Sequence, residues 1–166
     1  MEMLRTRGIG GVRVLPLSKQ LHVSRGSFYW HFENLQDLQG AMLDWWERAM
    51  TDSVIERIEA APRGGRKRLM LAGENILRAD LIRYDSSIRS WADGDKKAAR
   101  VLRRVLRKRL DYITSLFAEA GFSPAEARAR GELMAVYLMS ERAILMDESL
   151  KDRLRLLRRQ IRSLMS

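Results

Sequence analysis

Apolar residues recur at steps of three and four over most of the chain, and this spacing constrains the fold more than any other feature. In residues 35–60 the recurring apolar positions are Leu35, Leu38, Met42, Trp45, Ala49 and Met50. An α-helix gathers such positions on one face, whereas a half-buried strand would need strict alternation. No stretch of the chain has a strand pattern. The sequence therefore predicts an all-α fold with a long helix over residues 35–60.

Capping and turn residues divide the rest of the chain into further helices. The predicted segments cover residues 66–84, 85–91, 95–121, 123–146 and 150–164. Asp85 and Asp95 offer side-chain oxygens to two helix starts, and Gly121 suits a C-cap. Ser123 is followed by proline and then, at the third position, by Glu126, which makes a capping box and the clearest helix start in the chain.

The last two predicted helices each carry a heptad-like row of apolar and small residues. The rows include Leu133, Val136 and Ser140 in the first helix, and Leu150, Leu154, Leu157, Ile161 and Leu164 in the second. Two helices of this kind, joined by a short polar link, can form a four-helix bundle when two chains meet. We therefore expect a homodimer through these residues, with the alternative that both rows face the chain's own core.

Charge and composition limit the classes of function. The 166 residues carry a net charge of +10, and they include no cysteine and two histidines, His22 and His31. The positive charge favours an anionic partner such as DNA, although ribosomal and peripheral membrane proteins share it. Without cysteine, and with two distant histidines, neither a metal site nor another cofactor is predicted. No apolar run approaches the roughly 18 residues of a membrane span, so a soluble cytoplasmic protein without membrane contact is expected.

No arrangement of residues typical of an enzyme is present. The glycines of residues 8–11 lack the preceding strand and the Lys-Ser/Thr ending of a phosphate-binding loop. No nucleophile has an evident base. Glu141, Asp147 and Glu148 fall near the ends of the last helices, where we expect them to be solvated. A catalytic function is therefore not predicted.

Residues 17–32 have the pattern of two short helices around a tight turn. Pro16 suits the opening turn of the first helix, and Ser24 suits the N-cap of the second. On a helical wheel Phe28 and Phe32 share the core face. The residues on or beside the opposite face are Arg25, Gly26, Ser27, Tyr29, Trp30 and His31.

This outer face is suited to a DNA groove. Arg25 and Ser27 lie in the first turn, from which a recognition helix usually reaches base edges. Tyr29 and His31 can donate to phosphate oxygens, and Gly26 removes a side chain where the helix comes close to the duplex. The alternative interpretation is an ordinary aromatic-rich helical hairpin.

Residues 23–32 resemble the recognition-helix signature of the tetracycline-repressor (TetR) family. That signature has Gly-Val-Ser, then a basic residue, a small residue, and Tyr with His-Phe or Tyr-Phe, and this chain has Val-Ser-Arg-Gly-Ser-Phe-Tyr-Trp-His-Phe. Leu17 and Ser18 take the place of the family's Ile-Ala on the supporting helix. The chain departs from the family pattern at His22, which replaces a turn glycine, at Leu35, which replaces a frequent lysine, and in a short first helix.

The resemblance implies a division of the chain and a function. Residues 1–36 would form a three-helix helix-turn-helix DNA-binding domain, and residues 37–166 a ligand-binding and dimerisation domain. The DNA-facing set would be Arg25, Gly26, Ser27, Tyr29, Trp30 and His31, with Ser24 as the cap. The expected function is that of a transcriptional regulator, a repressor that a small-molecule ligand releases from a palindromic operator.

The resemblance also implies an apolar ligand pocket walled by the three helices between residues 66 and 121. The candidate lining is Leu71, Asn75, Ile82, Tyr84, Ile88, Trp91, Leu102, Leu106 and Tyr112. Such a cluster has the composition of a ligand site and equally that of a core. Two other functions remain as alternatives: a ligand-binding protein of this type that has lost operator binding, for which the short first helix argues, and a DNA-packaging protein without sequence preference.

Overall fold

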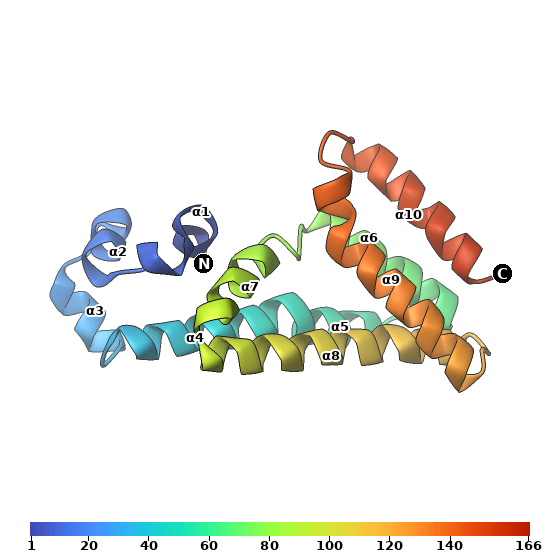
Figure 1. Ribbon diagram of the computed structural model, residues 1–166, viewed down its shortest axis with the longest axis horizontal. Helices are drawn as coiled ribbons and strands as arrows, with labels where there is room; N and C mark the ends of the chain where they lie inside the picture. Colours follow the sequence, from blue (N-terminus) through green and yellow to red (C-terminus); the bar gives the residue numbers. More distant parts are fainter. The chain divides into compact units, whose positions relative to one another are not determined.

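The computed structural model describes residues 1–166 and confirms the all-α fold (Figure 1). Its helices are α1 (Glu2–Gly11), α2 (Val14–Leu21), α3 (Arg25–His31), α4 (Leu35–Glu47), α5 (Ser53–Glu59), α6 (Gly65–Arg78), α7 (Asp85–Gly94), α8 (Lys96–Glu119), α9 (Pro124–Ile144) and α10 (Leu150–Leu164). The chain forms two compact units, residues 1–49 with 83–103 and residues 50–82 with 104–166, called here the first and second units. No helix combines the length and the apolar character needed to cross a membrane.

The first unit contains the helix-turn-helix and the helices that support it. α2 packs against α3, and α7 packs against α1. α1 is helical on both sides of Gly8, whose φ of 65° interrupts it. Trp46, fully buried on α4, donates from its indole nitrogen to Oδ1 of Asp85 on α7 over 3.1 Å. This buried hydrogen bond joins the long helix to α7 inside the first unit.

One predicted helix end and one predicted cap next to α7 are wrong, although α7 begins at Asp85 as predicted. The helix expected over residues 66–84 ends at Arg78, because the chain turns at Asp80, which has a left-handed φ of 48°. Leu81 and Tyr84 after this turn are buried. Asp85 does not cap α7 with its side chain, since that carboxylate accepts the bond from Trp46 instead.

The helix predicted over residues 35–60 is present but changes its winding near the middle. α4 begins after Asn34, whose Oδ1 accepts a hydrogen bond from the backbone nitrogen of Asp37 over 2.9 Å. Residues 48–52 then form one π-helical turn, in which Met50 and Thr51 are buried, and α5 follows directly. A π turn is rare and often occurs at a functional site.

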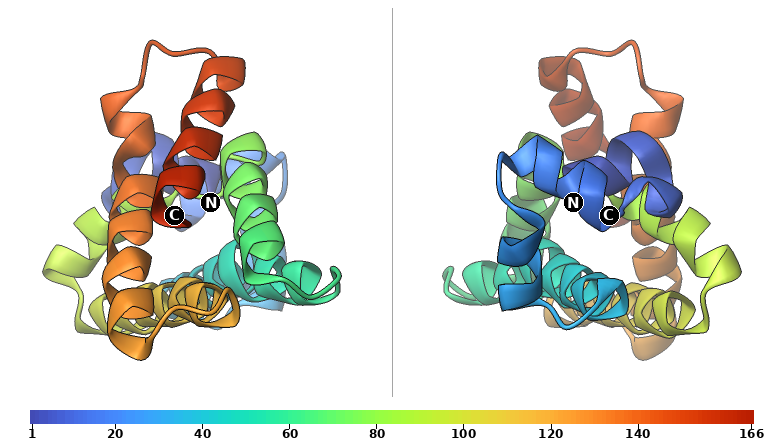
Figure 2. Two further views of the ribbon diagram at one scale, coloured as in Figure 1. Left: turned by 90° about the vertical axis from the view of Figure 1, so that its right-hand side faces the viewer. Right: turned by 90° about the vertical axis from the view of Figure 1, so that its left-hand side faces the viewer.

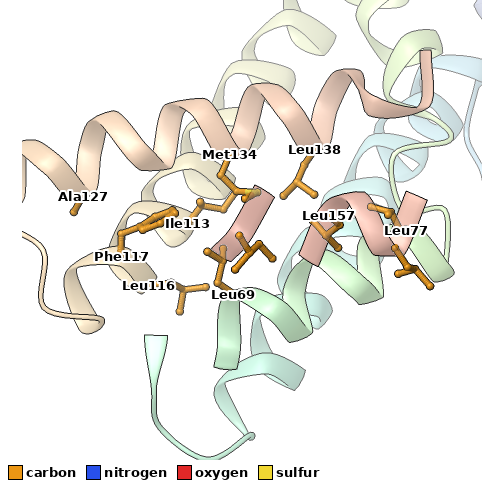
Figure 3. Close-up of a cluster of buried hydrophobic side chains, with 11 residues drawn as sticks. Leu69, Leu77, Ile113, Leu116, Phe117, Ala127, Met134, Leu138 and Leu157 are labelled. Atoms are coloured by element: carbon orange, nitrogen blue, oxygen red, sulfur yellow. The ribbon is translucent and has the colours of Figure 1, made fainter. Parts of the chain in front are cut away.

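Four helices, α6, α8, α9 and α10, enclose the apolar core of the second unit (Figure 3). Phe117, Met134 and Leu157 are fully buried within it. Figure 2 shows α10 between α6 and α9. α6 and α10 approach so closely at Gly73 that an added Cβ atom would lie 2.9 Å from the Leu157 side chain. A larger residue at position 73 would therefore require the Leu157 side chain to move.

Three predicted helix ends are confirmed, one in the first unit and two in the second. Oδ1 of Asp95 accepts hydrogen bonds from the backbone nitrogens of Lys97 and Ala98, over 2.7 and 2.9 Å. Gly121 has a φ of 101°, as a glycine C-cap requires. Ser123 and Glu126 form both bonds of the capping box at the start of α9.

A buried ion pair joins α9 to α10, and it corrects the expectation that Glu141 is solvated. The Glu141 side chain is 1% exposed, and both of its oxygens accept hydrogen bonds from the guanidinium of Arg153, which is 11% exposed. The carboxylate holds the pKa of Arg153 above its ordinary value, chiefly through this hydrogen bond. The pair is therefore a fixed structural contact at the end of the helical hairpin.

Replacing Glu141 by glutamine should destabilise the second unit by about 3–5 kcal/mol, because the buried guanidinium of Arg153 would lose its counter-charge. Urea unfolding followed by circular dichroism measures this change. Glu132→Gln on the same helix is the matched control, since Glu132 pairs with Arg128 at the surface and should contribute less than about 1 kcal/mol. Equal effects of the two substitutions would contradict the structural role of the buried pair.

Candidate nucleic-acid interface and ligand cavity

The turn between α2 and α3 is tight and left-handed. His22 has φ 54° and ψ 38°, and its backbone nitrogen donates to the carbonyl of Lys19 over 3.3 Å. Val23 then donates to the carbonyl of Ser18 over 3.0 Å. A non-glycine residue in this region carries a backbone cost of roughly 1–2 kcal/mol. The His22 substitution is thus accommodated without a change in the turn.

α3 is positioned at its start by a cap and at its middle by an aromatic anchor. Ser24 Oγ accepts from the backbone nitrogen of Ser27 over 3.1 Å. Phe28 is buried, and its ring centroid lies 5.1 Å from that of Tyr29 and 5.5 Å from that of Phe32. The burial of Phe28 therefore sets which side of α3 faces the protein and which side faces solvent.

The face of α3 opposite Phe28 is open to solvent. The Trp30 residue is 85% exposed and Tyr29 is 55% exposed. Arg25, Gly26, Ser27 and His31 are exposed as well, so every residue of the predicted DNA-facing set is accessible to solvent. A large aromatic residue is seldom left this exposed on a folded protein unless it has a partner. Neither Arg25 nor Lys19 pairs with a carboxylate, so both charges are available to an anion.

The second unit contains an apolar cavity of about 70 Å³. Its walls come from the π turn, α5, α6, the turn before α7, α8 and α9. The lining residues are Met50, Thr51, Val54, Ile55, Ile58, Ala72, Ile76, Leu81, Ile82, Leu106, Arg109, Leu110, Tyr112, Ile113, Ala135, Leu138 and Met139.

Only part of the predicted pocket lining belongs to this cavity. Ile82, Leu106 and Tyr112 line it. Leu71 and Asn75 do not line it, because each directly precedes a lining residue of α6, Ala72 or Ile76, and so lies about 100° away around the helix. Leu71 is 37% exposed. The other four candidates, Tyr84, Ile88, Trp91 and Leu102, are buried in the first unit.

Two walls of the cavity were not predicted from the sequence. One is the π turn with α5, where Met50, Val54 and Ile58 recur at every fourth position. The other is α9, which contributes Ala135, Leu138 and Met139 and had been considered only for dimerisation. The apolar spacing in residues 50–58 was the available signal, but the packing partner of that face could not be read from it.

The polar groups of the cavity wall bond to the protein itself. Arg109 donates from Nε to Thr51 Oγ1 over 2.9 Å and from a terminal nitrogen to the Met50 carbonyl over 3.4 Å, so α8 holds the π turn. The Tyr112 hydroxyl donates to Glu59 over 2.8 Å. The pKa of Tyr112 is raised above its ordinary value. Burial is the larger cause, and this hydrogen bond is the second.

The two predicted dimer rows differ in exposure. On α10, Leu154, Leu157 and Ile161 are buried and Leu164 packs against the same core, so this row faces its own chain, as the alternative interpretation had it. Leu150 is 40% exposed. On α9, Leu133 is 61% and Val136 65% exposed, and Ser140 is half-buried. We call Leu133, Val136 and the 39% exposed Met139 the α9 face.

The comparisons with known proteins concern the fold. No family model and no curated protein matches the sequence. Among solved structures, a TetR-family transcriptional regulator from Streptomyces coelicolor superposes with a TM-score of 0.80 at 18% identity, covering 98% of this chain and 82% of that one. A transcriptional regulator from Rhodococcus sp. Rha1 gives 0.75 at 18% identity, with 99% and 90% covered.

A third similar structure contains a ligand. The transcriptional regulator FadR from Bacillus subtilis, solved in complex with stearoyl-CoA, has a TM-score of 0.70 at 17% identity, covering 99% of this chain and 93% of that one. The likeness extends over nearly the whole chain in each case. The chain therefore has the fold of the TetR-family transcriptional regulators.

Proposed function

We propose that the protein is a transcriptional regulator of the TetR family that binds DNA through α3. The exposed aromatic and basic face of that helix is the observation that carries this proposal. A surface with Trp30 and Tyr29 open to solvent, beside an unpaired Arg25, is unfavourable in water and fits a groove lined by phosphates. Residues 1–36 act as the DNA-binding domain in this proposal, and residues 37–166 as the ligand-binding and dimerisation domain.

Each residue of the face has a role that its chemistry supports. Arg25 and Ser27 read base edges from the first turn, and Ser24 keeps that turn ordered. Tyr29 and His31 donate to phosphate oxygens. Trp30 packs its ring against the sugar or a base methyl group. The protein acts by binding rather than by catalysis, in the cytoplasm.

We further propose that two copies associate and bind a palindromic operator. The α9 face is the surface that supports this, since it exposes adjacent apolar side chains on a long helix. A two-fold dimer would present two α3 helices to successive major grooves. The α10 row is not included, because its apolar residues already fill the core of the second unit.

A ligand in the cavity has a direct route to the long helix. The cavity touches Met50 and Thr51 in the π turn, and α4 continues from that turn toward α3 along the same helical run. A ligand that displaces these two side chains would favour one winding of the turn over another. We propose that this lowers operator affinity, so that the protein is a repressor released by its ligand.

The second candidate is a regulator-like protein that binds the ligand but has lost operator binding. The interruption of α1 at Gly8 favours it, because α1 is not one continuous helix within the proposed DNA-binding domain. Selection of bound sequences from random duplex DNA at about 0.15 M salt separates the two. Recovery of a palindromic site supports the regulator, and failure to retain any duplex supports the second candidate. Binding without sequence preference would instead indicate a packaging role.

Arg25→Ala should weaken binding to the selected operator about 10- to 100-fold and relax the preference at one base position, because one bidentate contact to a base is lost. Fluorescence anisotropy with labelled operator at fixed salt measures both effects. Arg89→Ala is the matched control, since Arg89 is an exposed arginine of α7 in the same unit. If both variants lost affinity equally, sequence reading by α3 would be disproved.

Leu133→Glu combined with Val136→Glu should convert the dimer to a monomer at micromolar concentration, because two charges would replace the apolar centre of the α9 face. Sedimentation velocity measures the mass, and circular dichroism should show an unchanged helix content, since both side chains are exposed in the single chain. Leu71→Glu, at an exposed leucine of α6, is the control and should leave the dimer intact. A dimer that survives the double substitution would place the interface elsewhere.

A further inference from the structure

We propose that the cavity of the second unit binds an uncharged, flexible aliphatic molecule, such as a medium-chain alcohol, ketone or ester. The proposal gives the chemical class of the ligand, and the role of that ligand in regulation rests on the proposed function. The binding itself depends only on the second unit.

The lining excludes most polar ligands by its composition. Fourteen of the seventeen lining residues are aliphatic or methionine. A ligand group that gives up water there must find a partner in the wall, because an unsatisfied polar group costs roughly 1–3 kcal/mol. A hydrocarbon chain meets no such requirement.

The three polar lining residues are already engaged with other parts of the protein. Thr51, which is 2% exposed, accepts from Arg109. The guanidinium of Arg109 also reaches the Met50 carbonyl, and the Tyr112 hydroxyl points to Glu59. An anionic ligand would have to take Arg109 away from the π turn, whereas an uncharged one leaves these bonds in place. The wall thus favours a neutral molecule.

The shape of the cavity favours a chain over a ring. Its volume of about 70 Å³ is below the ~150 Å³ of an engineered cavity that holds benzene, so the walls must yield as a ligand enters. Met50 and Met139 can yield, because a thioether side chain turns easily between rotamers. Tyr112 is the one aromatic residue in the wall, so a flat aromatic ligand would have a single ring to stack on. Met139 is 39% exposed, which puts one end of the lining at the surface.

The test compares three probes. Octanoate differs from 1-octanol in its negative charge, and indole differs from it in being an aromatic ring instead of an aliphatic chain. The protein is labelled at its methionine methyl groups, and each probe is titrated at pH 7 without DNA while methyl spectra are recorded. We expect saturable shifts of Met50 and Met139 with 1-octanol, at a dissociation constant at least tenfold below those for octanoate and indole. Met3 and Met42, which are buried in the first unit, serve as internal references.

Two variants locate the binding. Ala135→Leu fills the cavity and should abolish the saturable shifts, whereas Ala129→Leu on the exposed side of the same helix should keep them. The probe series in the unmodified protein decides the ligand class even if Ala135→Leu fails to fold. Tighter binding of octanoate would make Arg109 an anion site and overturn the proposal, and so would tighter binding of indole or the absence of saturable shifts with 1-octanol.

The outcome is separate from the proposed regulation. If 1-octanol binds in the cavity but leaves operator binding unchanged, the ligand class stands and regulation through the cavity fails. If the protein binds no operator at all, the methyl titration still decides the ligand class.

Discussion

The hydrogen bonds from Arg109 to the π turn are the interaction on which the proposed regulation depends. They hold residues 50 and 51 in a winding that an ordinary α-helix would not keep, and they place both residues in the cavity wall. A π turn has one more residue per hydrogen-bonded ring than an α turn, so its formation or loss would change the helical phase of the residues around it. The π turn is therefore the place in the long helix where a change of helical phase would occur in the proposed regulation.

Burial decides which of the regular patterns in this chain are available to partners. The apolar row of α10 is as regular as that of α9, yet it is used up by contacts with α6 and α9, with Gly73 allowing the closest approach. The row of α9 stays exposed at Leu133 and Val136. The Glu141–Arg153 pair joins the two helices at one end, where a solvated carboxylate had been expected.

α3 shows the same principle at the surface proposed to face DNA. Phe28 fills a site in the first unit, and because residues of a helix have fixed angular offsets, this one buried ring sets the direction of every other side chain of α3. The exposed Trp30 and Tyr29 follow from it. Among the aromatic residues of α3, Phe28 is thus buried and anchors the helix, whereas Tyr29 and Trp30 are exposed.

The sequence alone determined what depends on neighbours along the chain: the all-α class, the caps at Ser24, Asp95 and Ser123, and the exposed face of α3. These follow from local backbone geometry and helical periodicity. Only the tertiary structure decided which helices wall the cavity, which row of the last two helices remains free, and that residues 84–91 belong to the first unit. An apolar position is buried by whatever helix packs on it, and periodicity identifies the face but never the partner.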